Sequence, residues 1–535
     1  MKKLLSFLLI TVFVLVLTAC GGGGGGGGGV SSSPSAGSPA GSTVSYSPAY
    51  TYNVPADKTS SDAYLIRRSV SVGILPTPGA TSYASVAVEN PVTETSFACK
   101  RFPHNTDEWP LPESDFVTTN RFLASIQSTK NYVVYGSEDD NANHSNSTEN
   151  FWVITDFTTN SGATRTFKLT NIGQHCRVWY DITNPNNLDD DDLTNIQNKL
   201  DAMFEVETAL CGSMVPTHNN YLSINSNTKL EIVIYEMEHS PQYTLCGYFS
   251  PKDLYPNEPN SNKAPIIYVS SYNISPETYS TVSHEFNHLL NYVKKVLNNN
   301  KRNMETWYTE LLSNTIEEVL EVFNGATDIA YSPRKMLPIF LCSYNYGLCW
   351  NQNMPSYANV YAFGAWLLRN YGGSALFHEI ATNEYVNEES IEMAVRSKGY
   401  NETFDSLRKK FAESLIYITD SGKPNFNKSV SENYYYKNNM YVTINMPAIN
   451  LNSNQFQLTS SASEGLATIL ADCTAGHPYV GPVIFNPEYH FSNLNNSYPE
   501  TRILDYGFEI QKLGSGLSQI EIPSSYYGSF EVVYK

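Results

Sequence analysis

The stretch Thr281-Val-Ser-His-Glu-Phe-Asn-His288 sets most of what the sequence predicts. His284 and His288 are four positions apart, so on an α-helix they lie about 40° apart around the axis and about one turn apart along it. Both imidazoles can then reach a single metal ion. Glu285 lies about 100° from His284, so its carboxylate would lean over the ion without binding it. There it could accept a proton from water.

A helix is predicted around this motif by its start signal and its apolar spacing. Ser275 has the short polar side chain typical of an N-cap, and Pro276 suits the first helical position. Apolar residues recur at helical spacing and would face a core. They are Val282, Phe286, Leu289, Val293 and Val296.

A second helix, expected over residues 304–323, supplies the candidate third ligand. Glu310 lies on its polar face, and a turn between the two helices would bring it back to the histidines. Two histidines and a glutamate form a common zinc site, in which water occupies the open fourth position. Glu305 is the weaker candidate, because an acid in the first turn of a helix often serves the helix dipole.

Two further polar residues lie near Glu310 on the second helix. Glu317 or Asn314 could orient His284 or His288 by a hydrogen bond to the ring nitrogen that does not bind the metal. The alternative is that both are ordinary solvated groups on a helix surface.

The second helix also carries a resemblance to a known class of enzymes. Its segment Trp307-Tyr-Thr-Glu-Leu-Leu-Ser313 resembles the ligand-bearing helix of gluzincin metallopeptidases. With the segment Gly247-Tyr-Phe249, the strand expected at Ile266 and the histidine motif, it is most similar to the hyicolysin family of bacterial zinc endopeptidases. The resemblance covers residues 165–420. One departure is Thr309-Glu310-Leu311, where an Asn-Glu-Gly-like sequence would be expected.

The resemblance implies both a fold and an activity. The fold would be α+β, with a thermolysin-like zincin domain that combines a mixed sheet with the active-site helices, flanked by β-rich domains. The activity would be hydrolysis of peptide bonds in proteins by a zinc endopeptidase. One zinc ion would be bound by His284, His288 and Glu310, with Glu285 as the base.

Two tyrosines are candidates for a role at the oxyanion of the reaction. Tyr361, in Tyr361-Ala-Phe-Gly364, resembles the tyrosine that opens a helix in gluzincins and steadies the oxyanion with its hydroxyl. Tyr357 is the reserve. The strand expected at residues 266–269 could offer its edge to an extended peptide substrate through backbone hydrogen bonds.

Composition divides the chain into five segments. The middle of the chain alternates strands, such as residues 230–235, with long helices, one of which would start at the acidic run 189–192. Segments on both sides are rich in short alternating runs punctuated by proline and glycine, which favour β structure. The expected division is 1–19 signal peptide, 20–43 tether, 44–160 N-terminal β-rich domain, 161–430 metallopeptidase domain and 440–535 C-terminal β domain.

The first twenty residues predict a lipid anchor. Two lysines precede an apolar run over residues 4–17, which is too short to span a bilayer, since a span needs about 20 residues. The run ends in Leu17-Thr-Ala-Cys20, which resembles the lipobox of bacterial lipoproteins and implies lipidation of Cys20, including palmitate. An ordinary cleavable signal is the alternative. The glycine- and serine-rich segment that follows would be a flexible tether. The body would then be anchored at the cell envelope, with Gly21 favouring an outer membrane.

Charge and cysteine content restrict partners and crosslinks. The chain has 52 acidic and 34 basic residues, a net charge of −18, which disfavours nucleic acid as a partner because such binding needs a positive field. Eight cysteines include Cys20, so an odd number remains and at least one thiol is free. Cys342 and Cys349 could close a small disulfide loop or remain two separate thiols.

Two other functions remain as alternatives to an endopeptidase. One is a surface-binding adhesin whose protease-like domain is inactive, which the tyrosine-rich β segments and long tether would suit. The other is a zinc aminopeptidase. That class normally carries a Gly-x-Met-Glu-Asn-like segment that binds the substrate amine, to which Met237-Glu-His239 is only superficially similar.

Overall fold

The computed structural model describes residues 48–69, 147–183, 188–324, 336–451 and 506–535, apart from short gaps within these ranges. The expected signal peptide, Cys20 and the tether lie outside the described residues. Cys349, the possible disulfide partner of Cys342, also lies outside them. None of the described helices combines the length and the apolar character needed to cross a bilayer.

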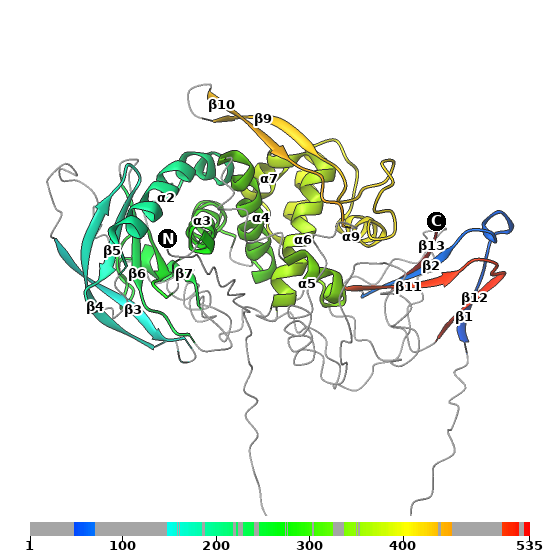
Figure 1. Cartoon of the computed structure of the whole chain (residues 1–535), viewed down its shortest axis with the longest axis horizontal. Helices are drawn as coiled ribbons and strands as arrows, with labels where there is room; N and C mark the ends of the chain where they lie inside the picture. The colour runs from blue at the N-terminus through cyan, green and yellow to red at the C-terminus, as the bar shows by residue number, and fades with distance from the viewer. Residues whose placement is uncertain are drawn as a thin grey trace, which may run out of the picture.

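A six-stranded mixed sheet forms one layer of the structure (Figure 1). In spatial order its strands are β3 (Thr148–Asp156), β4 (Ser161–Ile172), β5 (Cys176–Asp181), β6 (Leu230–Tyr235), β8 (Ile266–Ser270) and β7 (Gly247–Phe249). β6 pairs in parallel with both β5 and β8, and the remaining pairs are antiparallel. Every residue of β6 and β8 is buried, which explains why these two strands are continuous apolar runs in the sequence. Both strands were predicted and are confirmed.

The edge of this sheet differs from the expectation. β8 lies between β6 and β7, so the prediction that residues 266–269 form an edge is wrong. β7 occupies that edge and pairs antiparallel with β8, with Gly247 opposite Val269 and Phe249 opposite Ile267. A strand of three residues has too little alternation to be recognised from sequence.

Helices α2 (Asp190–Cys211) and α3 (Pro276–Asn291) pack against the sheet, and α4 (Thr306–Asn324) packs beside α3 (Figure 1). α2 begins at the acidic run, where the Asp189 side chain accepts a hydrogen bond from the Asp192 backbone N–H at 2.8 Å. α3 begins at its proline and continues into a π-helical segment, Tyr292–Asn298.

The remaining described helices follow α4 in the sequence. They are α5 (Met336–Ser343), α6 (Met354–Tyr371), α7 (Gly373–Thr382), α8 (Asn387–Ser397) and α9 (Phe404–Glu413). The predicted core face of α3 is confirmed, because Val282, Phe286 and Leu289 are fully buried. This mixture of helix and sheet is an α+β arrangement.

Smaller sheets join segments that are far apart in the sequence. β1 (Pro48–Asn53) pairs with β12 (Gln519–Pro523), and β2 (Ala63–Arg68) lies between β11 (Phe508–Gly514) and β13 (Ser529–Tyr534). β9 (Val430–Tyr436) and β10 (Met440–Met446) form a hairpin.

The pairing of the strands differs from the expected domain division. β1 and β2 of the expected 44–160 domain pair with β11, β12 and β13 of the expected 440–535 domain, so these segments do not form two separate units. The boundary expected at residue 160 falls between β3 and β4, which are paired. Sequence composition reports local structure, and the pairing of distant strands is not a local property.

Candidate metal centre

Helices α3 and α4 bring His284, His288 and Glu310 together. The Nε2 atoms of the two histidines are 3.1 Å apart. Glu310 Oε2 is 3.2 Å from Nε2 of His284, and Glu310 Oε1 is 3.6 Å from Nε2 of His288. One potential ligand atom from each residue lies within 4.8 Å of the others. The three residues that the sequence selected as metal ligands therefore converge on one point.

The chemistry of these three side chains fits a bound cation. Glu310 is 3% exposed, and its Oε2 makes no hydrogen bond of normal geometry with any described residue. Such a buried oxygen costs free energy unless a donor or a cation compensates for its lost hydration. Two imidazoles and one carboxylate are a donor set that suits divalent transition metals.

The charges around the centre are predominantly negative. Burial alone would lower the pKa of His284, but the neighbouring carboxylates of Glu310, Glu317 and Glu285 outweigh it and raise that pKa well above its usual value. Burial lowers the pKa of His288 to about 4. Within the described part of the chain, neither lysine nor arginine pairs with Glu310 or Glu317. A cation between the histidines would offset this negative charge.

Glu317 orients His284. Its Oε1 lies 2.8 Å from Nδ1 of the imidazole, and the Ser280 hydroxyl donates to its other oxygen. Because a carboxylate accepts, Nδ1 of His284 carries the proton of the neutral ring, and the Nε2 lone pair of that form faces the centre. Asn314 makes no such contact, since its Nδ2 donates to the backbone oxygen of Glu310 at 2.8 Å.

Glu285 lies beside the three candidate ligands and is 2% exposed. Burial raises its pKa to about 8, and the charges of Glu310 and Glu317 act in the same direction. The charge of His284 and a hydrogen bond from the Phe249 backbone N–H oppose the increase. The carboxylate of Glu285 is thus held between helix α3 and strand β7.

The close contact between β7 and α3 depends on Gly247. A Cβ atom at this position would lie 2.6 Å from Cγ2 of Thr281 and 2.8 Å from the backbone oxygen of Tyr268. It would also lie 3.2 Å from Cγ of Glu285. A residue with a side chain would therefore push β7 away from the glutamate.

Glu305 is not placed at the centre. Its Oε2 accepts a hydrogen bond from the indole nitrogen of Trp307 at 2.8 Å, and its Oε1 lies 3.4 Å from Nδ2 of Asn387. These contacts hold the start of α4 and leave Glu310 as the acid that meets the histidines.

The two candidate tyrosines are placed differently from the expectation. Tyr361 does not open a helix but lies within α6, where its buried hydroxyl donates to Glu318 Oε2 at 3.2 Å. Glu318 is eight residues beyond Glu310 on α4, which is about 12 Å along the helix axis. Tyr361 therefore does not face the metal ligands, and that expectation is wrong.

Tyr357, one turn earlier on α6, lies near the centre. Burial and the negative charges of Glu310 and Glu285 raise the pKa of its hydroxyl well above the usual value. The influence of both carboxylates on this hydroxyl places it in the same electrostatic environment as the candidate ligands.

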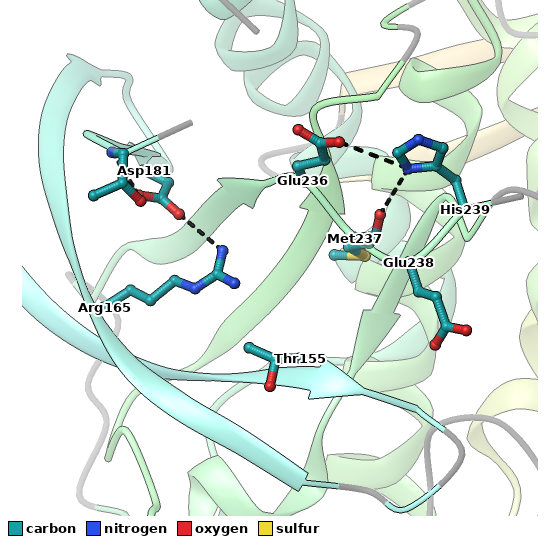
Figure 2. Close-up of a pocket in the computed structure, with 8 residues that line it drawn as sticks. Thr155, Arg165, Asp181, Glu236, Met237, Glu238 and His239 are labelled. Carbon is teal, nitrogen blue, oxygen red and sulfur yellow. Dashed lines mark hydrogen bonds and ion pairs between the residues drawn. The ribbon is translucent and has the colours of Figure 1, made fainter. Parts of the chain in front are cut away.

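A separate pocket lies at the carboxyl ends of β5 and β6, enclosed by the curved β3–β4 pair (Figure 2). Its volume is about 590 Å³. Arg165 Nη1 pairs there with Asp181 Oδ2 at 3.1 Å, and His239 Nδ1 lies 3.2 Å from the backbone oxygen of Met237. The Met237-Glu-His239 segment thus follows β6 and is not part of the edge strand β7 beside Glu285.

Comparison with known proteins gives one partial match. No family model matches the chain. The chain is similar to the neutral metalloprotease ShpI of Staphylococcus hyicus, with 27% identity over 199 residues. The alignment covers 32% of this chain and 42% of that relative, so less than half of the relative's length is matched. This similarity and the grouped His284, His288 and Glu310 support a relationship to metallopeptidases.

Proposed function

We propose that this protein is a zinc-dependent endopeptidase of the hyicolysin-like gluzincin type, with a thermolysin-like catalytic domain, that hydrolyses peptide bonds in proteins. The observation that carries the proposal is the convergence of two imidazole nitrogens and the Glu310 carboxylate beside a buried glutamate, Glu285.

The distances between the three candidate ligands suit zinc. Zinc lies about 2.0–2.2 Å from histidine nitrogens and carboxylate oxygens, so tetrahedral ligand atoms are about 3.4 Å from one another. The distances among His284, His288 and Glu310 are 3.1, 3.2 and 3.6 Å. When bound, zinc lowers the pKa of water and polarises the carbonyl group of the scissile bond.

Glu285 is the group that moves the proton. Its carboxylate accepts a proton from the attacking water and passes it to the leaving amine nitrogen. Burial gives this acid a raised pKa, and a nearby divalent cation would bring it back toward its ordinary value. The Phe249 backbone N–H keeps the carboxylate in place during both transfers.

The substrate would lie along β7. This strand is the edge of the described sheet and packs against Glu285, so an extended peptide paired with it would bring a carbonyl group to the centre. Backbone pairing of this kind binds peptides with little regard to side chains. The Tyr357 hydroxyl would stabilise the negative charge that develops on the carbonyl oxygen.

The proposal places the enzyme at the cell envelope. The lipobox-like segment ending at Cys20 supports a lipid anchor, and the glycine-rich tether would hold the catalytic body away from the membrane. An outer membrane is the expected site.

Casein hydrolysis by the purified protein from residue 44 onward tests the activity. Wild type should cleave casein, a zinc chelator should abolish cleavage, and added zinc should restore it. Glu285→Gln should bind zinc but lose activity, whereas Glu305→Gln, the same change outside the centre, should keep it. Cleavage that resists the chelator, or that survives in Glu285→Gln, would rule the mechanism out.

A further inference from the structure

A chain of buried polar side chains lies behind His288. Ser313 Oγ on α4 is 3.2 Å from Nδ1 of His288 and 3.2 Å from Oδ1 of Asn287. Asn287 Oδ1 also accepts from Nδ2 of Asn291 at 2.6 Å, and Asn287 Nδ2 donates to Sγ of Cys211 at 3.1 Å. Ser313, Asn287 and Cys211 are fully buried, so this chain connects α2, α3 and α4 inside the core.

The direction of the hydrogen bonds in this group of side chains determines which ring nitrogen of His288 carries the proton. A serine hydroxyl has one proton to donate. Because Ser313 donates that proton to Oδ1 of Asn287, it can only accept a hydrogen bond from His288. Nδ1 of His288 is therefore the protonated ring nitrogen, and Nε2 keeps its lone pair.

The opposite direction of these hydrogen bonds would prevent His288 from binding a metal. If the Asn287 amide were turned by half a rotation, its NH₂ group would face Ser313, and the hydroxyl would then donate to Nδ1 of His288. The proton of the neutral ring would move to Nε2, the atom that points at Glu310 and His284. The structure has the first orientation, in which Asn287 Oδ1 accepts from Asn291 and Nδ2 donates to Cys211.

We propose that Ser313 and Asn287 are positioning residues that fix the Nδ1-protonated tautomer of His288 and so present its Nε2 lone pair to the metal. This inference rests on the proposed metal centre. It differs from the control of His284, which a carboxylate orients by charge. A neutral hydroxyl and a neutral amide fix the tautomer of His288. They add no further negative charge to a centre that already contains Glu285, Glu310 and Glu317.

The tautomer can be read directly in protein labelled with ¹⁵N-histidine. The metal-free, chelator-treated protein is measured near pH 7 by long-range ¹H–¹⁵N correlation, with His288→Asn used to assign the signals. Wild type should show a protonated Nδ1 and a lone pair on Nε2 of His288. Ser313→Ala should show a mixture of the two tautomers, and Ser313→Thr, which keeps the hydroxyl, should restore the wild-type pattern.

Zinc affinity gives the second readout. Loss of such an outer partner costs about 10- to 100-fold in metal affinity, so Ser313→Ala should bind zinc more weakly by that factor and Ser313→Thr should not. Ser390→Ala is the matched control, because Ser390 is a buried serine whose hydroxyl bonds Tyr308 and the Ile380 backbone oxygen, outside the centre. It should leave zinc affinity unchanged.

Two results would overturn the inference. One is a wild-type His288 with its proton on Nε2 in the metal-free protein. The other is Ser313→Ala with a single Nδ1-protonated tautomer and wild-type zinc affinity. Zinc binding and tautomers as expected, but no cleavage of any protein by wild type, would instead remove the proposed function and leave the role of Ser313 standing.

Discussion

Gly247 on β7 lies so close to Glu285 on α3 that a Cβ atom at the glycine would be 3.2 Å from Cγ of the glutamate. Phe249, two residues further along β7, donates its backbone N–H to the same carboxylate. The strand at the edge of the sheet therefore both borders and holds the proposed base. A shift of β7 should therefore lower the catalytic activity and leave metal binding unchanged.

Gly247→Ala tests this relationship. The added methyl group would displace β7 or Glu285, and a shift of this size should lower kcat/KM by about 100-fold. Zinc content should stay as in wild type, because no metal ligand is touched. Gly422→Ala, at an exposed turn, is the control. Unchanged kcat/KM in Gly247→Ala would show that β7 does not position the base.

Glu317→Gln should weaken metal binding. The amide loses the charge that holds Nδ1 of His284, and loss of such a partner lowers affinity by about 10- to 100-fold. Competition with a chromophoric zinc chelator measures the effect. Asn314→Ala, which removes a contact to a backbone oxygen only, should bind zinc as wild type does. Equal losses in both variants would contradict a specific role for Glu317.

Removal of the hydroxyl group from Tyr357 and from Tyr361 should affect different properties, catalysis in the first case and stability in the second. Tyr357→Phe should lower kcat by about 100-fold, as expected on removal of a hydroxyl that stabilises an oxyanion. Tyr361→Phe should leave kcat near wild type and lower the free energy of unfolding by about 1 kcal/mol, through loss of its hydrogen bond to Glu318. Steady-state kinetics and urea unfolding of both variants measure these effects. The reverse pattern would return the catalytic role to Tyr361.

The local parts of this structure are predictable from the sequence. The start of α2 at its aspartates and of α3 at Pro276 depends on a few neighbouring residues, and the buried strands β6 and β8 show as apolar runs. The three candidate metal ligands follow from spacing on helices. Each of these features depends on residues within one element or on two helices that follow one another in the sequence.

The features that sequence reasoning missed depend on contacts between elements. β7 takes the sheet edge because of how it pairs with β8, and β2 joins β11 and β13 across most of the chain. Tyr357 and Tyr361 are one turn apart on α6, so only the packing of that helix decides which of them faces the centre. The Ser313–Asn287 chain needs two helices to be in register, although both residues lie inside the quoted motifs.

Asp253 provides a pH dependence that is independent of the metal centre. The acid is 1% exposed, and burial raises its pKa to about 6, although the Tyr268 hydroxyl and the Asn262 backbone N–H donate to it. The folded state thus holds the proton more tightly than the unfolded chain. The stabilisation is complete below about pH 4 and is lost as the pH rises through about 6, by about 3 kcal/mol in total.

Asp253→Asn removes this titration. Between pH 4 and 7, the free energy of unfolding of wild type should fall relative to that of the variant by about 3 kcal/mol. Guanidinium unfolding of both proteins at the two pH values measures the difference. A difference that does not change with pH would show that Asp253 keeps an ordinary pKa in the folded protein.

The central claim is that His284, His288 and Glu310 together bind one zinc ion. Its most direct test is the zinc bound per protein molecule after dialysis, measured by atomic spectroscopy on wild type, Glu310→Gln and Glu305→Gln. The account predicts one zinc ion in wild type and in Glu305→Gln, and loss of the ion from Glu310→Gln. A Glu310→Gln protein that keeps a full zinc ion would contradict it.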